Sequence, residues 1–219
     1  MKYSLTPLFS ASLLLTLSLQ SHAKELHPYL LKAGDIVFQE GFGVQPQAIK
    51  DATDSKWTHV GMIIPNKTGE LVVVEAVQPV KITKLNDFVK RNPSSFYAMR
   101  LKNSEEILTK ETFTKAETYL NQQIGKNYDL RFQWSDDKIY CSELVWKVYK
   151  EAAGIELCKP AKFKDLHLEH PSVKKIIVER FGSINALPLE EFIVPPSDIA
   201  KSELLVEVPK RKKPSKVKQ

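Results

Sequence analysis

Two apolar runs separated by a short turn-forming segment place the strongest constraint on how this chain of 219 residues can fold. The runs are "THVGMII" and "ELVVVEAV", which are rich in β-branched residues, and Pro65 to Gly69 between them has the composition of a hairpin connection. If that connection is centred on Lys67, His59 stands directly opposite Glu75, with Cβ atoms about 4.5–5.5 Å apart on one face. The sequence therefore predicts an antiparallel pair of strands that brings an imidazole to a carboxylate.

The residues that continue this face of the hairpin are small or apolar: Gly61, Ile63, Leu71 and Val73. We expect a helix to pack across them. Further strands are predicted at "GDIVFQE", "VKITKL", "FYAMRLK" and residues 204–208, and short helices at "LNDFVKR" and "SVKKIIVERF". The segment "GFGVQPQAIKDATDSKW" between the first two strands is expected to be a loop, because its two glycines allow unusual backbone angles.

Two longer helices have clear start and stop signals. The first follows Thr109 as N-cap and ends near Gly125, and the second begins near Cys141 and ends at Gly154. In the second, the apolar positions form one stripe, and Glu143 and Lys147 are spaced to form an ion pair on the solvent side. Strands cluster early and helices lie between and after them without regular βαβ alternation, so the fold class is α+β.

Cys141 is the residue in this pattern with the most distinctive chemistry. It lies in the first turn of an amphipathic helix, where unpaired backbone N–H groups and the helix dipole stabilise a thiolate. A thiolate nucleophile requires a base within hydrogen-bond reach and a third group that orients the base. His59 and Glu75 across the hairpin supply both, so the sequence predicts Cys141, His59 and Glu75 as a catalytic set.

A disulfide and a metal site are weaker predictions for the cysteines and histidines. Cys141 and Cys158 are the only cysteines, and an exported chain can form a disulfide, but the intervening helix would separate them by roughly 18–20 Å. Each of the three residues of the catalytic set could also have only a structural role. The segment "HLEH" places His167 three residues before His170, yet no HExxH or paired CxxC spacing accompanies it. We therefore predict neither a metal site nor a cofactor.

The two ends of the chain differ from its centre. Lys2, the apolar run "LTPLFSASLLLTLSL" and Ser21 to Ala23 have the pattern of a signal peptide, so residues 1–23 are expected to be removed and 24–208 to form one domain. We expect the mature chain to be soluble in the periplasm or secreted. Residues 209–219 hold six of the basic residues behind the net charge of +6, and are expected to be a disordered tail able to contact an anionic surface. The body is close to neutral, which disfavours nucleic-acid binding.

Six segments in this order resemble a known family: "AGDIVFQ", "THVGMII", "VVEAVQPVKITKLNDF", "IGKNYD", "YCSELVWKVYKEAAGIEL" and "VPPSDIAKS". They are similar to the YiiX/YaeF-like permuted papain-fold proteins, relatives of NlpC-type cell-wall endopeptidases and lecithin retinol acyltransferase-like proteins. The resemblance covers about Gly34 to Ser202, and its most specific parts are "THVG" and "YCSEL". It implies a circularly permuted papain-like fold, an antiparallel sheet or partial barrel packed against helices.

The resemblance also implies an activity. His59, Glu75 and Cys141 fall on the family's catalytic positions, and Tyr128, or in its place Tyr140, would help to stabilise an oxyanion. The chain is then expected to be a cysteine amidase or peptidase acting on a peptide, a peptidoglycan stem peptide or a lipid amide. An acyl hydrolase or transferase with the same residues is the enzymatic alternative, and a non-catalytic binding module on the same fold is the other.

Overall fold

The computed structural model describes residues 26–135 and 137–212, and its centre is an antiparallel sheet of six strands. The strand order is β10-β5-β1-β2-β3-β4, and every neighbouring pair is antiparallel. The strands are β1 (Ile36–Gln39), β2 (His59–Pro65), β3 (Leu71–Glu75), β4 (Lys81–Lys84), β5 (Tyr97–Leu101) and β10 (Leu205–Glu207). Each coincides with a strand expected from the sequence, and the α+β class is confirmed.

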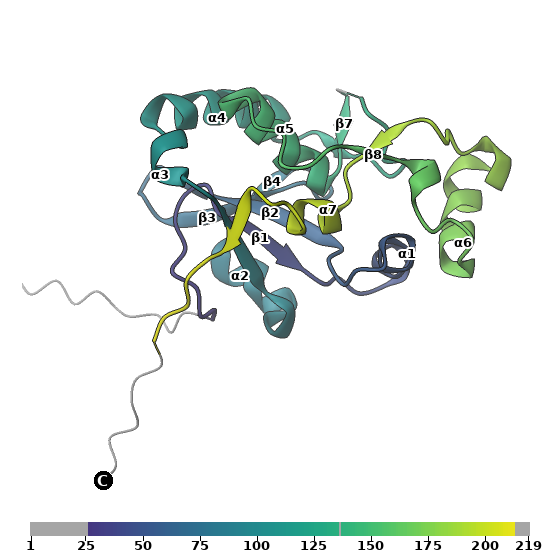
Figure 1. Ribbon diagram of the computed structural model, residues 1–219, viewed down its shortest axis with the longest axis horizontal. Helices are drawn as coiled ribbons and strands as arrows, with labels where there is room; N and C mark the ends of the chain where they lie inside the picture. Colours follow the sequence, from purple (N-terminus) through teal and green to yellow (C-terminus); the bar gives the residue numbers. More distant parts are fainter. Residues whose placement is uncertain (1–25, 136, 213–219) are drawn as a thin grey trace, which may run out of the picture.

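Helices cover both faces of the sheet (Figure 1). One face packs against α5 (Cys141–Ala153) and α4 (Lys110–Gln123), and its core includes Val60, Met62 and Val74 from the strands. The opposite face packs against α2 (Leu85–Arg91), with Ile63 and Val73 in a separate cluster around Phe88. The expectation that the cysteine helix crosses the Ile63 face is therefore wrong. Alternate residues of a strand point to opposite faces, and α5 lies on the even-numbered one.

The segment expected to be a loop after β1 contains a helix, α1 (Val44–Thr53). Pro46 lies in its first turn, where the missing backbone N–H is not needed, so the proline does not oppose the helix. The loop interpretation was wrong because it gave too much weight to the two glycines. Helix α1 lies beside α6 (Pro171–Phe181), apart from the central sheet (Figure 1).

The β2–β3 hairpin has a register that differs by two residues from the predicted one. Met62 pairs with Val74 and Pro65 with Leu71, so the connection is centred on Thr68 instead of Lys67. Asn66 is the cause, because its side-chain oxygen accepts hydrogen bonds from the backbone N–H groups of Thr68 and Glu70, both at 2.9 Å. A shift of two residues keeps each side chain on its expected face. His59 and Glu75 are thus diagonal neighbours on one face.

The remaining elements are short. Strand β6 (Asn127–Tyr128) pairs with β7 (Lys138–Ile139) in parallel, and β8 (Ala161–Lys162) pairs with β9 (Phe192–Ile193) in antiparallel orientation. The short helices are α3 (Ser104–Ile107), α7 (Pro196–Ala200) and the 3-10 turns η1 (Pro93–Ser95), η2 (Phe163–Asp165) and η3 (Ile184–Ala186). In the chain, η1 lies between α2 and β5, α3 lies between β5 and α4, and η2 and η3 flank α6.

The ends of the described chain pair with each other. Leu30 N donates to Pro209 O and Arg211 N to Pro28 O, both at 2.8 Å. The expected domain boundary after Val208 therefore falls inside a paired segment. The predicted signal peptide and the distal part of the basic tail lie outside the described residues. Within residues 26–135 and 137–212, no helix is both long and apolar enough to cross a bilayer.

Candidate active site

Cys141 is the first residue of α5, directly after its N-cap Tyr140. The residue is 2% exposed, and three groups contact its thiol: the His59 ring, the Tyr128 hydroxyl and the backbone N–H of Val60. Burial by itself would raise the pKa of Cys141, but the hydrogen bond and positive charge of His59 outweigh it, and the pKa is lowered. These contacts therefore make the Cys141 thiol at the helix start easier to ionise than a free cysteine.

His59 is the first residue of β2 and lies between Cys141 and Glu75. Its Nε2 is 2.6 Å from Glu75 Oε2, which leaves Nδ1 as the ring nitrogen available to the thiol. Its ring also stacks on Phe88, with centroids 5.8 Å apart. Burial lowers the pKa of His59, but the hydrogen bonds with Cys141 and Glu75 raise it to about 9. The ring is therefore held in one orientation and favoured as an imidazolium beside the sulfur.

Glu75 is fully buried and is held by two residues that the sequence did not identify. Arg91, the last residue of α2, donates through both terminal nitrogens, with Nη1 2.7 Å from Oε2. Thr83 Oγ1 of β4 donates to Oε1 at 2.5 Å. Burial would raise the pKa of Glu75, yet the hydrogen bonds from Arg91 and His59 hold it well below its usual range. The carboxylate therefore stays charged and fixed.

Gly61 gives the diagonal contact between His59 and Glu75 the room it requires. A Cβ at this position would come within 2.5 Å of Val73 Cγ1 and 3.5 Å of Glu75 Cβ. Any side chain at position 61 would therefore push against the strand that carries the carboxylate. In the observed register, steric hindrance therefore explains why position 61 in the "THVG" segment is a glycine.

The two candidate oxyanion residues have different surroundings. The Tyr128 hydroxyl faces the Cys141 thiol and accepts a hydrogen bond from Gln45 Nε2 at 3.2 Å. Burial raises the pKa of Tyr128 well above its ordinary value, so the group is a neutral donor. Tyr140 is buried, and its hydroxyl accepts a hydrogen bond from Val194 N at 3.0 Å. Gln45 belongs to α1, the helix expected to be a loop, and sequence reasoning missed it for that reason.

A cleft with charged and polar side chains in its wall opens beside the imidazole, and we call it the polar cleft. Its lining includes His59, Gln45, Arg91, Tyr128 and Lys138, together with apolar groups that make up most of its surface. Cys141 does not line this cleft. Cys141 is instead among the residues that line a second, apolar hollow. A substrate that reaches both Cys141 and His59 must therefore bridge two different environments.

Cys158 has a different environment from Cys141. Both cysteines are free, so the disulfide alternative does not apply. Burial raises the pKa of the Cys158 thiol to about 12, with Asp198 and Glu156 acting in the same direction. The two thiols therefore differ strongly in their tendency to ionise.

The helix that follows Cys141 carries a second buried acid. Glu143 pairs with Lys147 at 2.9 Å, as the spacing predicts, but the Glu143 side chain is fully buried and that of Lys147 is 12% exposed. The expectation of a pair on the solvent side is wrong, because Lys147 lies over the Trp134 ring, which covers this part of the helix. Burial raises the pKa of Glu143 to about 7.

The two histidines of "HLEH" lie in the segment that leads into α6. His170 is the N-cap of α6, where its Nδ1 accepts from Ser172 N, and it lies 3.1 Å from Asp51. Among the described residues, no three His, Cys, Asp or Glu side chains are grouped closely enough to hold a metal ion. His170 therefore has a structural role at the start of α6.

Comparison with known proteins places this chain in a family. The chain is 38% identical over 180 residues to the uncharacterized protein YiiX of Escherichia coli K12, covering 82% of this chain and 86% of YiiX. A crystal structure of YiiX from E. coli O157:H7, described as a metalloprotein, has a TM-score of 0.75 and 35% identity over 82% of this chain and 97% of that chain. Residues 30–208 match the permuted papain-like amidase family YaeF/YiiX, C92. The chain belongs to this family of permuted papain-like amidases.

Proposed function

We propose that this protein is a cysteine hydrolase that cleaves an amide bond, with Cys141 as nucleophile, His59 as base and acid, and Glu75 as the group that orients the imidazole. The observation that carries the proposal is the connected set of contacts from the Cys141 thiol through His59 to a carboxylate held by Arg91. Each protonation state in this set favours a thiolate beside an imidazolium. A binding module on the same fold has no chemical need for this arrangement.

The reaction follows from the positions of these groups. The Cys141 thiolate attacks the amide carbonyl carbon, and the negative charge that develops on the oxygen is stabilised by the Cys141 backbone N–H and the Tyr128 hydroxyl. The C–N bond then breaks as His59 donates its proton to the leaving amine, which leaves a thioester on Cys141. Water attacks the thioester while His59 accepts its proton, and a carboxylic acid and the free thiolate are released.

The expected location of the protein widens the choice of substrates. If residues 1–23 act as a signal peptide, the mature protein meets peptidoglycan stem peptides, lipid amides and short peptides outside the cytoplasm. The family supports an amide substrate in general terms.

Thiol reactivity tests this proposal with an internal control. Iodoacetamide should label Cys141 much faster than Cys158 at pH 7, because one pKa is lowered and the other is raised to about 12. The pH dependence of the alkylation rate at Cys141 should report a pKa below the free-thiol pKa of about 8.5. This rate should fall in the variant His59→Ala. Equal and slow labelling of both cysteines would favour the binding module.

Turnover is tested by presenting wall fragments, lipids and amide libraries to the wild type and to Cys141→Ala. An acyl adduct on Cys141, detected by mass spectrometry in the wild type alone, would identify both the nucleophile and the acyl group. Cleavage that persists in Cys141→Ala would rule out the proposed mechanism.

A further inference from the structure

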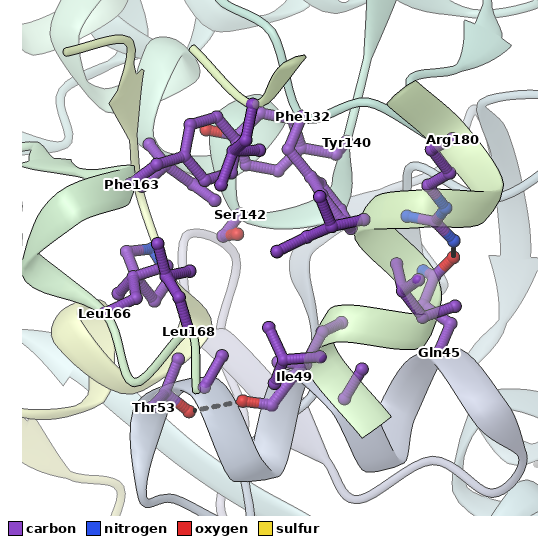
Figure 2. Close-up of a pocket in the computed structure, with 18 of the residues that line it drawn as sticks. Gln45, Ile49, Thr53, Phe132, Tyr140, Ser142, Phe163, Leu166, Leu168 and Arg180 are labelled. Carbon is purple, nitrogen blue, oxygen red and sulfur yellow. Dashed lines mark hydrogen bonds between the residues drawn. The ribbon is translucent and has the colours of Figure 1, made fainter. Parts of the chain in front are cut away.

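An apolar pocket lies beside Cys141 and is separate from the polar cleft. Figure 2 shows its labelled side chains arranged around a central space between α1, α6 and the segments before and after them. Its lining is almost entirely hydrocarbon and includes Ala48, Ile49, Phe163, Leu168, Val173 and Ile177. The centre of a water-sized sphere can move through about 80 Å³ of this space, several times the roughly 10–15 Å³ that one water molecule needs. The pocket is therefore narrow, which suits a slender group such as an alkyl chain.

The two hollows are arranged for the two halves of a cleaved molecule. His59 lines the polar cleft, and the leaving amine must reach His59 to receive its proton. The leaving group therefore occupies the polar cleft. Cys141 is among the residues that line the apolar pocket, so an acyl group on the sulfur can extend into that pocket. Gln45 belongs to both linings and marks their boundary.

The polar side chains around the pocket are mostly bonded to protein partners. Thr53 Oγ1 donates to Ile49 O at 2.8 Å, and Arg180 Nη2 donates to Gln45 Oε1 at 2.5 Å (Figure 2). A peptide in this space would lose the hydration of its backbone groups with few partners in return, at a cost of roughly 1–3 kcal/mol for each unpaired group. A linear hydrocarbon chain carries no such cost. The lining therefore selects an alkyl chain over a peptide.

Ser142 is the exception in this lining. Its Oγ is buried and has no hydrogen-bond partner among the described residues, and Figure 2 shows the hydroxyl directed toward the central space. Ser142 follows the nucleophile in the chain, so this hydroxyl lies at the end of the pocket nearest Cys141. A donor at that point can bind an oxygen at the carbonyl end of an acyl group, while the rest of the chain meets hydrocarbon only.

We infer that the apolar pocket binds the hydrocarbon chain of a fatty-acyl amide, and that the substrate is a polar amine acylated with such a chain. This inference rests on the proposed function. Cys141 forms a thioester with the fatty acyl group as the C–N bond breaks, His59 protonates the departing amine, and water releases the fatty acid.

Activated esters of one alcohol with increasing acyl length test the pocket directly. We would measure acylation of Cys141 by p-nitrophenyl acetate, butyrate, octanoate and dodecanoate, from the p-nitrophenol burst below the micelle concentration and from the mass of the adduct. The second-order rate constant should rise by up to about fourfold for each added CH₂ until the pocket is filled. An equal rate for acetate and dodecanoate would overturn the inference while leaving the hydrolase in place.

A matched pair of substitutions on α6 separates the pocket from general effects. Val173 is buried in the pocket lining, whereas Val178, on the same helix, is 46% exposed and outside it. Val173→Phe should lower the dodecanoate-to-acetate rate ratio at least tenfold, and Val178→Phe should keep the wild-type ratio. The dodecanoate-to-acetate rate ratio does not depend on the fraction of protein that is folded. If Val173→Phe does not fold, Ala52→Leu on α1 replaces it as the pocket variant. An unchanged ratio in both pocket variants would contradict the inference.

Binding of the product acid is measured in parallel and does not depend on turnover. Calorimetry with sodium dodecanoate and the wild-type protein should show binding with a negative heat-capacity change, which Val173→Phe weakens and Val178→Phe does not. If this binding is found but no ester or amide acylates Cys141, the pocket assignment holds and the hydrolase fails. If dodecanoate does not bind and chain length has no effect, the pocket assignment fails by itself.

Discussion

His59 Nε2 lies 2.6 Å from Glu75 Oε2, although the two residues are not directly opposite on β2 and β3. Their contact runs diagonally across one face of the sheet, over the space left by Gly61. Diagonal neighbours are within reach only of longer side chains. The contact therefore requires a side chain as long as that of glutamate. An aspartate at position 75 could not make the same contact without movement of the strand.

The pH dependence of catalysis should report this contact. His59 must be protonated to donate to the leaving amine, so kcat/KM should fall as the pH rises through its pKa of about 9. Glu75→Gln removes one of the partners that raise this pKa. The fall of kcat/KM on the alkaline side of the pH profile should therefore move to lower pH by about one unit or more. Glu70→Gln, in the exposed turn, is the control and should leave this fall in place. A fall that does not move in Glu75→Gln would show that Glu75 does not act on His59.

The Arg91–Glu75 pair should contribute to stability as well as to the site. Arg91→Ala leaves a buried carboxylate with fewer donors, and we expect the free energy of unfolding to fall by about 2 kcal/mol, less than for a fully buried pair because Arg91 is 39% exposed. The neighbouring Lys90 is 64% exposed and forms only a 3.9 Å contact with Asp87. Lys90→Ala should change stability by less than about 0.5 kcal/mol in the same urea titration. Equal losses in both variants would contradict this account.

The sequence allowed prediction of the three central residues but not of the groups that hold them. His59 and Glu75 remained on one face because the register error was an even number of residues. Thr83 could be placed only with the β3–β4 pairing, and Arg91 only with the position of α2 on the sheet. Both depend on contacts between elements that hydrophobic periodicity does not encode.

The apolar pocket was not predictable for the same reason. Its walls come from α1, α6, the start of α5 and several connecting segments, which lie far apart in the chain and meet only in the folded protein. Because the segment of α1 was expected to be a loop, neither its contribution to the pocket wall nor the role of Gln45 could be predicted. Recognition of Pro46 as a first-turn residue would have recovered the helix.

Gly61 provides a steric test of the corrected register. Gly61→Ala should destabilise the protein by about 1–3 kcal/mol and slow alkylation of Cys141, because the new Cβ meets Val73 Cγ1 and displaces the strand that carries Glu75. Adding Val73→Ala removes the nearest obstructing atom, so the double variant should regain part of the alkylation rate. If Gly61→Ala labels at the wild-type rate, the close approach is not needed for the site.

The buried Glu143 should make stability depend on pH. Its pKa is about 7 in the folded protein and about 4.5 in the unfolded chain, so between these values the folded state binds the extra proton and stability falls as the pH rises. The expected loss from pH 4.5 to 7 is on the order of 3 kcal/mol, and Glu143→Gln should abolish it. Glu156→Gln, at a half-exposed acid, is the control and should retain the wild-type slope. Urea titrations at both pH values measure the difference, and a slope unchanged by Glu143→Gln would contradict the assignment.

Substitution of the two tyrosines near Cys141 should have different effects: Tyr128 should matter for catalysis and Tyr140 for stability. Tyr128→Phe removes the hydroxyl that faces the thiol, so we expect the pKa of Cys141 to rise and kcat to fall by about 10- to 100-fold with little change in KM. Tyr140→Phe leaves the buried Val194 N–H without its acceptor and should cost about 1–3 kcal/mol of stability. Its Cys141 alkylation profile should match the wild type when the protein is folded. The reverse result would assign the oxyanion role to Tyr140. In that case Tyr140→Phe would be stable with a lowered kcat, and Tyr128→Phe would have the wild-type kcat.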